Sequence, residues 1–326
     1  MESPIPETMR AVVVHKAGGP EVLKLEERPI PQPKDGWSLV HIHARGLNHS
    51  EIFTRQGLSP SVKFPRILGI ECAGEIVATT DSARLPVGQK VVSLMGEMGR
   101  AFDGSYADYA LLPNNQLYPI TTGLPWEALA AIPETFYTAY GSLLNLRLEP
   151  GQCVLVRGAT SGVGVAFARL ARAAVPAIHL VGSTRSANRE SLLRDAGFDE
   201  TVLDQGNVLQ AEGTPFDRVL ELIGPATMKD TCSHVQEGGI VCSTGQLGGQ
   251  WCLDGFDPIE DLPPNGYLTS FYSGNVSEER LSSLFSFIEE KHVDATPAKV
   301  FTLDEMQEAH RFLESSHGFG KVVVTE

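Results

Sequence analysis

The sequence predicts an α/β protein with a doubly wound parallel sheet and a second, β-rich domain. Three observations favour this fold: a strand followed by a glycine-rich turn and a helix, an alternation of strands and helices after residue 152, and short strands before residue 112. The chain has 326 residues, which is enough for two domains with a sizeable core.

The glycine-rich turn lies between residues 158 and 164. The apolar run 153–156 before it is typical of a buried parallel strand, and apolar residues recur at helical spacing after it. Small residues let a pyrophosphate approach the backbone, and the N–H groups at the start of the helix point toward it. Such a turn can also serve only to pack a helix on a strand, but the strand before it and the helix after it favour dinucleotide binding.

Strands and helices alternate in the rest of this half. We expect further strands at residues 177–182, 200–203, 218–222, 239–245 and 267–273, and helices at residues 189–197 and 227–235. Strands that alternate with helices form parallel sheets, because each helix returns the chain to the same edge.

The first part of the chain is β-rich. We expect strands at residues 11–15, 38–43, 74–78 and 90–94, and helices at residues 124–132 and 136–146. Two amphipathic helices, at residues 277–290 and 303–313, precede a last β run at residues 321–325. Thr302 and Glu305 have the spacing of a capping box. The last run suits a tail that crosses back to complete the first domain.

Charge and composition exclude several classes of partner. The net charge of −14 argues against nucleic acid and anionic membranes. No apolar run approaches the roughly 18 residues of a membrane span, and the first residues do not form a secretory signal. The five cysteines form no CxxC pair and leave an odd count, which is typical of reduced thiols. We therefore expect a cytoplasmic protein.

The end of the second strand predicts which dinucleotide binds. NAD requires a carboxylate about 20 residues after the glycines, but residues 165–189 contain no Asp or Glu. Ser183, Thr184 and Arg185 follow this strand instead, and Arg189 lies one helical turn further on. Hydroxyl groups and a guanidinium suit the 2′-phosphate of NADPH, although an arginine at a loop tip can also be merely solvated.

The whole chain from Met9 onward resembles the medium-chain dehydrogenase/reductase superfamily. It is most similar to the zinc-free NADPH:quinone oxidoreductase branch, which is zeta-crystallin-like. Four segments carry the resemblance, at residues 9–23, 46–51, 68–74 and 133–140. The resemblance implies a GroES-like catalytic domain from residues 1–123 and 275–326, with a Rossmann domain from residues 124–274 between its two parts.

The resemblance also implies where a metal would lie. The zinc alcohol dehydrogenases of this superfamily hold their catalytic metal with Cys, His and Cys, and this chain has Asn48, Ile70 and Glu134 at the corresponding positions. Isoleucine cannot bind a metal, and both thiolates are missing. Residues 75–151 contain no cysteine, so the four-cysteine lobe of those enzymes has no counterpart. We predict that no metal is bound.

Family positions imply the catalytic pocket. Asn48 would lie beside the nicotinamide and orient the substrate or a ribose hydroxyl, unless it only satisfies its own loop backbone. Phe53 would offer an aromatic platform, and Ile70 an apolar wall. Phe102, Phe136 and Tyr137 are either further ring contacts or core residues.

The glycine turn, the end of the second strand and the matched family positions together predict the cofactor contacts. These residues are Thr138, Ala159, Thr160, Ser161, Gly162, Val163, Gly164, Ser183, Thr184, Arg185, Arg189, Ile223, Gly245, Leu247, Phe271 and Tyr272.

Five further residues are interpreted as structural. Glu71 is expected to be a partly buried carboxylate with an arginine or backbone partner. Cys72 is a buried small hydrophobe rather than a reactive thiol, and His310 is a satisfied structural histidine. His41 and His43 share one face of a strand, which can suggest a metal site, but we expect no third ligand nearby.

These observations predict hydride transfer from NADPH to a small, planar, electron-poor acceptor, with a quinone as the expected class. No strong general acid stands out, which suits a quinone because its reduced oxyanion is weakly basic. Two alternatives stay open: an NADPH-dependent alkenal or enone (enoyl) reductase, and an NADPH-binding, crystallin-like protein without useful turnover. The resemblance further implies a homodimer.

Overall fold

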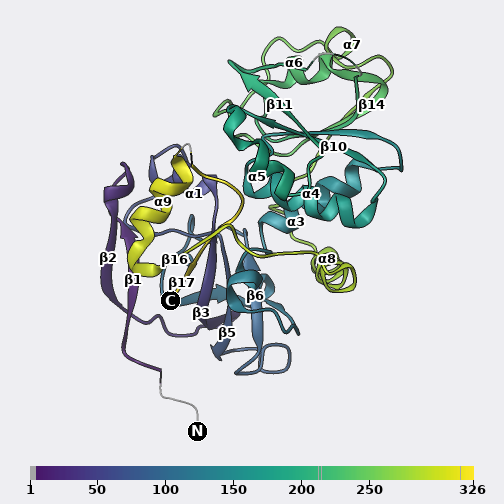
Figure 1. Ribbon diagram of the computed structural model, residues 1–326. Coiled ribbons are helices and arrows are strands. Elements are labelled where there is room, and N and C mark those ends of the chain that lie inside the picture. The colour runs from purple at the N-terminus through teal and green to yellow at the C-terminus, as the bar shows by residue number, and fades with distance from the viewer. Residues whose placement is uncertain (1–4, 212, 214, 316) are drawn as a thin grey trace. The chain divides into compact units, whose positions relative to one another are not determined.

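The computed structural model describes residues 5–211, 213, 215–315 and 317–326 (Figure 1). The chain forms two compact units. The first unit contains Met1–Glu134, Gly274–Leu281 and Ala295–Glu326, and the second unit contains Thr135–Ser273 and Ser282–Asp294.

The first unit is built on two sheets. The smaller sheet has the order β2-β1-β4, and the larger has the order β16-β17-β3-β5-β6-β8, with β7 paired on β3. Its strands are β1 (Thr8–Val14), β2 (Leu23–Pro29), β3 (Trp37–Leu47), β4 (Arg66–Ile67), β5 (Glu71–Ala78), β6 (Lys90–Leu94), β7 (Tyr109–Pro113), β8 (Tyr118–Pro119), β16 (Lys299–Thr302) and β17 (Val322–Thr325). Its helices are η1 (Pro20–Val22), α1 (His49–Arg55), η2 (Asn114–Gln116), α2 (Trp126–Ala130), η4 (Leu303–Glu305) and α9 (Met306–Glu314).

The C-terminal segment completes the larger sheet, as the sequence predicts. β17 pairs antiparallel with β3, with Val323 opposite Gly46, and parallel with β16. In Figure 1 the yellow strands β16 and β17 lie beside the purple strand β3. The predicted capping box is also present, because the Thr302 N–H donates to the Glu305 carboxylate at 2.9 Å. The pairing of β17 with β3 brings residues that are far apart in the sequence side by side.

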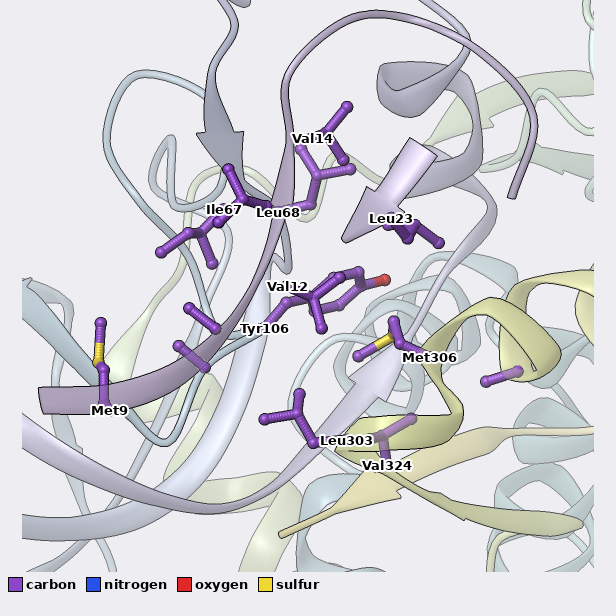
Figure 2. Close-up of a cluster of buried hydrophobic side chains, with 14 of the residues drawn as sticks. Met9, Val12, Val14, Leu23, Ile67, Leu68, Tyr106, Leu303, Met306 and Val324 are labelled. Carbon is purple, nitrogen blue, oxygen red and sulfur yellow. The ribbon is translucent and has the colours of Figure 1, made fainter. Parts of the chain in front are cut away.

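A buried hydrophobic cluster fastens the C-terminal helix to the N-terminal strands. Figure 2 shows the Tyr106 ring among side chains that include Val12, Leu303 and Met306. These four residues are at most 1% exposed. Truncating a buried aliphatic side chain of this kind typically costs about 2–5 kcal/mol. The cluster therefore holds the C-terminal segment firmly in the first unit.

The second unit is a doubly wound sheet with the order β12-β11-β10-β9-β13-β14-β15. All neighbouring strands are parallel except β12, which pairs antiparallel with β11. The strands are β9 (Cys153–Arg157), β10 (His179–Thr184), β11 (Glu200–Gln205), β12 (Val208–Leu209), β13 (Phe216–Glu221), β14 (Val235–Ser243) and β15 (Tyr267–Ser270). The helices are α3 (Thr135–Leu146), α4 (Gly162–Ala174), η3 (Ala187–Arg189), α5 (Glu190–Asp195), α6 (Met228–Ser233), α7 (Pro258–Asp261) and most of α8 (Glu278–Lys291), whose residues up to Leu281 belong to the first unit.

The predicted parallel sheet is confirmed, but the bounds of its elements shift by a few residues. The strand expected at residues 239–245 begins earlier, at Val235, because Val235 pairs with Phe216 ahead of a register shift. The strand expected at residues 267–273 ends at Ser270. Among the described residues, no helix is both long enough and apolar enough to cross a bilayer.

Two segments lie in a different unit from the predicted one. Residues 124–134 belong to the first unit, because α2 packs on β3, β5 and β17. Residues 282–294 belong to the second unit, where the Phe287 ring of α8 lies 5.8 Å from the Tyr140 ring. Both contacts join segments that are distant in the chain, so local sequence patterns do not reveal them.

Candidate functional site

The glycine-rich turn joins β9 to α4 in the second unit. Ser161 caps the helix, because its hydroxyl accepts a hydrogen bond from the Gly164 N–H at 3.1 Å. Gly158 has a φ of +88°, which favours glycine. A Cβ on Gly164 would lie 2.7 Å from the Ala159 carbonyl oxygen, so this position also requires glycine. The turn can therefore present N–H groups at the helix N-terminus to a pyrophosphate.

The strand order reverses at β9, which lies between β10 and β13. In sheets of this kind, ligands bind outside the carboxyl ends of the strands at that point. Since the strands are parallel, the segments that follow β9, β10, β13, β14 and β15 all lie at this edge. The predicted cofactor residues in these segments and in the first turn of α4 are Ala159, Thr160, Ser161, Gly162, Val163, Gly164, Arg185, Arg189, Ile223, Gly245, Leu247, Phe271 and Tyr272.

The end of β10 carries Ser183 and Thr184, both buried. The Ser183 hydroxyl accepts a hydrogen bond from the Gly158 N–H at 3.0 Å and so braces the glycine turn. The Thr184 hydroxyl accepts one from the Ser186 N–H at 3.3 Å. Arg185 follows them with an exposed side chain, and Arg189 ends η3. The side chain of Arg185 is thus available to an anion at the strand end.

Thr138 and two of the candidate aromatic residues lie on α3 in the second unit. Phe136 and Tyr137 are 2% and 0% exposed, which makes them core residues. The Tyr137 ring lies 5.6 Å from the Phe271 ring, whereas Tyr272 is 69% exposed. Thr138 accepts a hydrogen bond through its carbonyl oxygen from the Ser142 hydroxyl, which fixes this turn of α3.

A buried charged cluster that no sequence motif predicts lies beneath the turn. The Arg157 guanidinium, which is fully buried, donates to both Asp204 oxygens, at 2.7 and 3.0 Å, and to Asp230 at 2.6 Å. Glu221, also buried, accepts hydrogen bonds from the N–H groups of Ile223 and Gly224. These contacts fix the backbone after β9 and β13. The available signal in the sequence is that β9 and β13 each end on a charged residue, Arg157 and Glu221.

Asn48 is the N-cap residue of α1 in the first unit and joins a second buried cluster. The Lys321 ammonium donates to Glu71 Oε1 at 2.5 Å, to Asn48 Oδ1 at 2.7 Å and to the Leu47 carbonyl at 3.1 Å. The Asn48 amide donates to Glu71 at 2.8 Å, and Glu71 Oε2 accepts from the Glu134 N–H at 2.8 Å. Glu71 therefore has the expected backbone partner, but its charged partner is a lysine rather than an arginine.

Glu51 is a second buried carboxyl that no sequence motif predicts. It lies on α1 at 1% exposure and accepts a hydrogen bond from the Ile70 N–H at 3.4 Å. Burial raises the pKa of Glu51 to about 7, although the charge of Lys321 opposes this shift. Glu51 can therefore hold a proton near neutral pH. Phe53 lies half-buried on the same helix.

Comparison with known proteins identifies the family. A family model described as "Alcohol dehydrogenase GroES-like domain" matches residues 34–122, and one described as "Zinc-binding dehydrogenase" matches residues 196–324. The human quinone oxidoreductase is 31% identical over 251 residues, which are 74% of this chain and 74% of the human protein. The chain belongs to the medium-chain dehydrogenase/reductase family and is quinone oxidoreductase-like. It is an oxidoreductase, as predicted.

Solved structures agree with the fold of this oxidoreductase. A mycobacterial protein in complex with NADPH is 24% identical, with a TM-score of 0.83, and the match covers 98% of this chain and 100% of that protein. An NAD-dependent alcohol dehydrogenase is 26% identical, with a TM-score of 0.80, over the same shares of the two chains. Proteins with this fold therefore include one solved with NADPH and one described as NAD-dependent.

Two structural predictions for this oxidoreductase are confirmed. Cys72 is fully buried, and burial raises the pKa of its thiol to about 12. His310 is buried between Arg55 and the Tyr106 hydroxyl, at 3.1 and 3.0 Å, and burial lowers its pKa to about 3. Phe102, for which the sequence allowed either a ring contact with the acceptor or a core position, contacts the Trp37 ring edge-on at 5.0 Å and packs on a core cluster.

The prediction that no third ligand lies near His41 and His43 is wrong. The Glu326 carboxylate lies 3.1 Å from His41 Nε2 and 2.8 Å from His43 Nδ1. Glu326 follows β17, which pairs with β3, so the sheet brings together residues that are nearly 300 positions apart. Sequence spacing alone cannot reveal this group.

Proposed function

We propose that this oxidoreductase uses NADPH to reduce a small planar quinone and that its catalytic site works without a metal. When bound, NADPH supplies the hydride. The residues of the chain bind the cofactor, orient the acceptor and exclude water, while the solvent supplies protons.

The position of Arg185 is the observation that most strongly supports NADPH as the cofactor. Its side chain is exposed after β10 and makes no hydrogen bond or ion pair with any described residue. This is the strand end at which a dinucleotide fold contacts the adenosine ribose. Residues 165–189 offer no carboxylate to the ribose 2′-hydroxyl. A guanidinium in this place supports recognition of a 2′-phosphate.

The residues at the positions that correspond to the zinc ligands of the alcohol dehydrogenases support a catalytic site without zinc. Ile70 has no ligand atom, and the Asn48 amide is held between Glu71 and Lys321. The Lys321 ammonium already supplies positive charge at 2.5 Å from Glu71. A divalent cation placed there would be repelled by this ammonium, so the donor set does not suit zinc.

A panel of acceptors tests the proposed substrate class. Quinones are supported by the human relative and by the apolar Ile70 and the aromatic Phe53, because a flat ring gains stacking area. At the same NADPH concentration, we expect kcat/KM with benzoquinone and naphthoquinone derivatives to exceed kcat/KM with alkenals and enones. Higher values with enones would contradict the quinone proposal. Tight NADPH binding with neither class turned over would favour the crystallin-like alternative.

Glu51 favours the enone reductase as the second candidate. An enone yields a basic enolate that benefits from a proton donor, and the pKa of Glu51 lies at about 7 because of burial. Glu51→Gln should leave quinone reduction unchanged if the solvent protonates the product. A selective loss of enone reduction in this variant would support the second candidate.

We also propose a homodimer. β15 is the last strand of its sheet, and its Tyr267 and Leu268 side chains are 62% and 40% exposed. An exposed apolar edge strand is a surface that a second copy can cover. Light scattering should give twice the 35.2 kDa of one chain, and Leu268→Lys should shift the mass toward the monomer. A monomeric wild type would contradict the proposal.

A further inference from the structure

We propose that His41, His43 and Glu326 form a binding site for a divalent transition-metal ion such as Zn²⁺, separate from the Asn48–Glu71–Lys321 cluster. One ligand atom from each of the three residues lies within 4.8 Å of the other two. A tetrahedral zinc ion with bonds of about 2.0–2.1 Å holds its ligand atoms roughly 3.3 Å apart. The two distances to Glu326, 3.1 and 2.8 Å, already approach this value.

The backbone places the two imidazoles before any metal arrives. His41 and His43 lie two residues apart on β3, so their side chains leave the same face of the strand. The His41 ring stacks on Tyr109 at 4.7 Å, and the His43 ring stacks on Trp126 at 4.4 Å. Because both rings are held by packing, little side-chain entropy remains to be lost on binding.

The environment of the second ring nitrogen of His43 indicates a pre-organised metal site. His43 Nε2 is buried, has no hydrogen-bond partner and lies 3.8 Å from a carboxylate oxygen of Glu75. Metal-binding histidines usually direct their other ring N–H toward a carboxylate, which orients the ring and fixes its tautomer. With Nδ1 on the metal, a small movement of Glu75 would complete this arrangement.

The charge of the surroundings also suits a cation. Glu326 and Glu75 face the two rings, and Asp108 adds a third negative charge near His41. A neutral imidazole is the form that binds metal, and two imidazoles with one carboxylate match the ligand preferences of zinc, cobalt, nickel and copper. The remaining positions would be filled by water.

Equilibrium dialysis of the chelator-treated full-length protein against ZnCl₂ tests this site. We expect one saturable zinc per chain. We expect at least a tenfold loss of affinity in His43→Gln and in Glu326→Gln, and a tenfold to hundredfold loss in Glu75→Gln. Because Glu326 is 41% exposed, its variant should fold even if His43→Gln does not. The matched control is His179→Gln, which removes a histidine 3.2 Å from Glu200 in the second unit.

Tryptophan fluorescence tests independently whether the metal binds beside His43. Trp126 stacks on His43, so Ni²⁺ or Cu²⁺ bound at this site should quench the emission of Trp126. The variant Trp126→Phe should lose this saturable quenching but should still bind zinc in equilibrium dialysis. The proposal would be overturned if the wild type bound no zinc. It would also be overturned if His43→Gln and Glu326→Gln bound zinc as tightly as His179→Gln does. NADPH oxidation should be unchanged in Glu326→Gln, because this residue is not part of the proposed catalytic site.

Discussion

The glycine turn of the second unit and the Asn48–Glu71–Lys321 cluster of the first unit are assembled in opposite ways. The turn is one contiguous stretch of small residues whose binding groups are backbone N–H groups. The cluster joins side chains up to 273 residues apart and depends on buried charges. A local site tolerates change elsewhere in the chain, whereas a long-range site fails when one distant partner is lost.

Lys321→Met should have the largest effect, because it keeps the alkyl chain and removes the ammonium beside Glu71. Removing one partner of a buried ion pair leaves an uncompensated charge and typically costs about 3–5 kcal/mol of stability. Chemical denaturation should show this loss in the first unit. The double variant Lys321→Met/Glu71→Gln should recover most of it.

An exposed lysine provides the matched control for this prediction. Lys229 pairs with Asp261 at 2.8 Å but is 49% exposed, so Lys229→Met should cost at most about 1 kcal/mol. If the two lysine variants lost equal unfolding free energy, burial of the Lys321 pair would not explain the effect of Lys321→Met.

Glu51 predicts a pH dependence of stability in the first unit. The folded-state pKa of about 7 lies above the ordinary value of 4.5, because burial disfavours the charged carboxylate. The folded protein therefore binds this proton more tightly than the unfolded chain does. The stability that Glu51 contributes is fully present below pH 4.5 and is lost as the pH rises through about 7.

Glu51→Gln isolates this contribution. Between pH 4.5 and pH 8, the unfolding free energy of the wild type should fall by roughly 2–3 kcal/mol relative to the variant. Denaturation of both proteins across this range measures the difference. Parallel pH curves would contradict a raised pKa for Glu51.

Arg185→Ala should have a smaller effect that is confined to one ligand. Loss of a charge-assisted bond to phosphate costs about 1.5–3 kcal/mol, so NADPH binding should weaken by roughly tenfold to a hundredfold while NADH binding barely changes. Calorimetric titration of both nucleotides measures the effect. Arg194→Ala is the control, because Arg194 is exposed and pairs with Glu190 within α5. A similar loss for both nucleotides would mean that Arg185 does not recognise the 2′-phosphate.

The contrast between the two sites explains what the sequence could predict. The parallel sheet, the glycine turn and the capping box at Thr302 follow from residue periodicity and short spacings, and the structure contains all of them. Lys321 and Glu326 reach their partners only because β17 pairs with β3. Glu51 is an ordinary acidic residue in the sequence, and only its burial changes its chemistry.

Comparing NADPH with NADH in the wild-type protein tests the proposed function most directly. Each nucleotide would be titrated into chelator-treated protein, and its oxidation by a naphthoquinone would then be followed at equal concentration. We expect NADPH to bind roughly tenfold to a hundredfold more tightly and to give the higher kcat/KM, because only NADPH offers a phosphate to Arg185. Equal binding of NADH, or turnover that appears only when zinc is restored, would contradict an NADPH-dependent, metal-independent reductase.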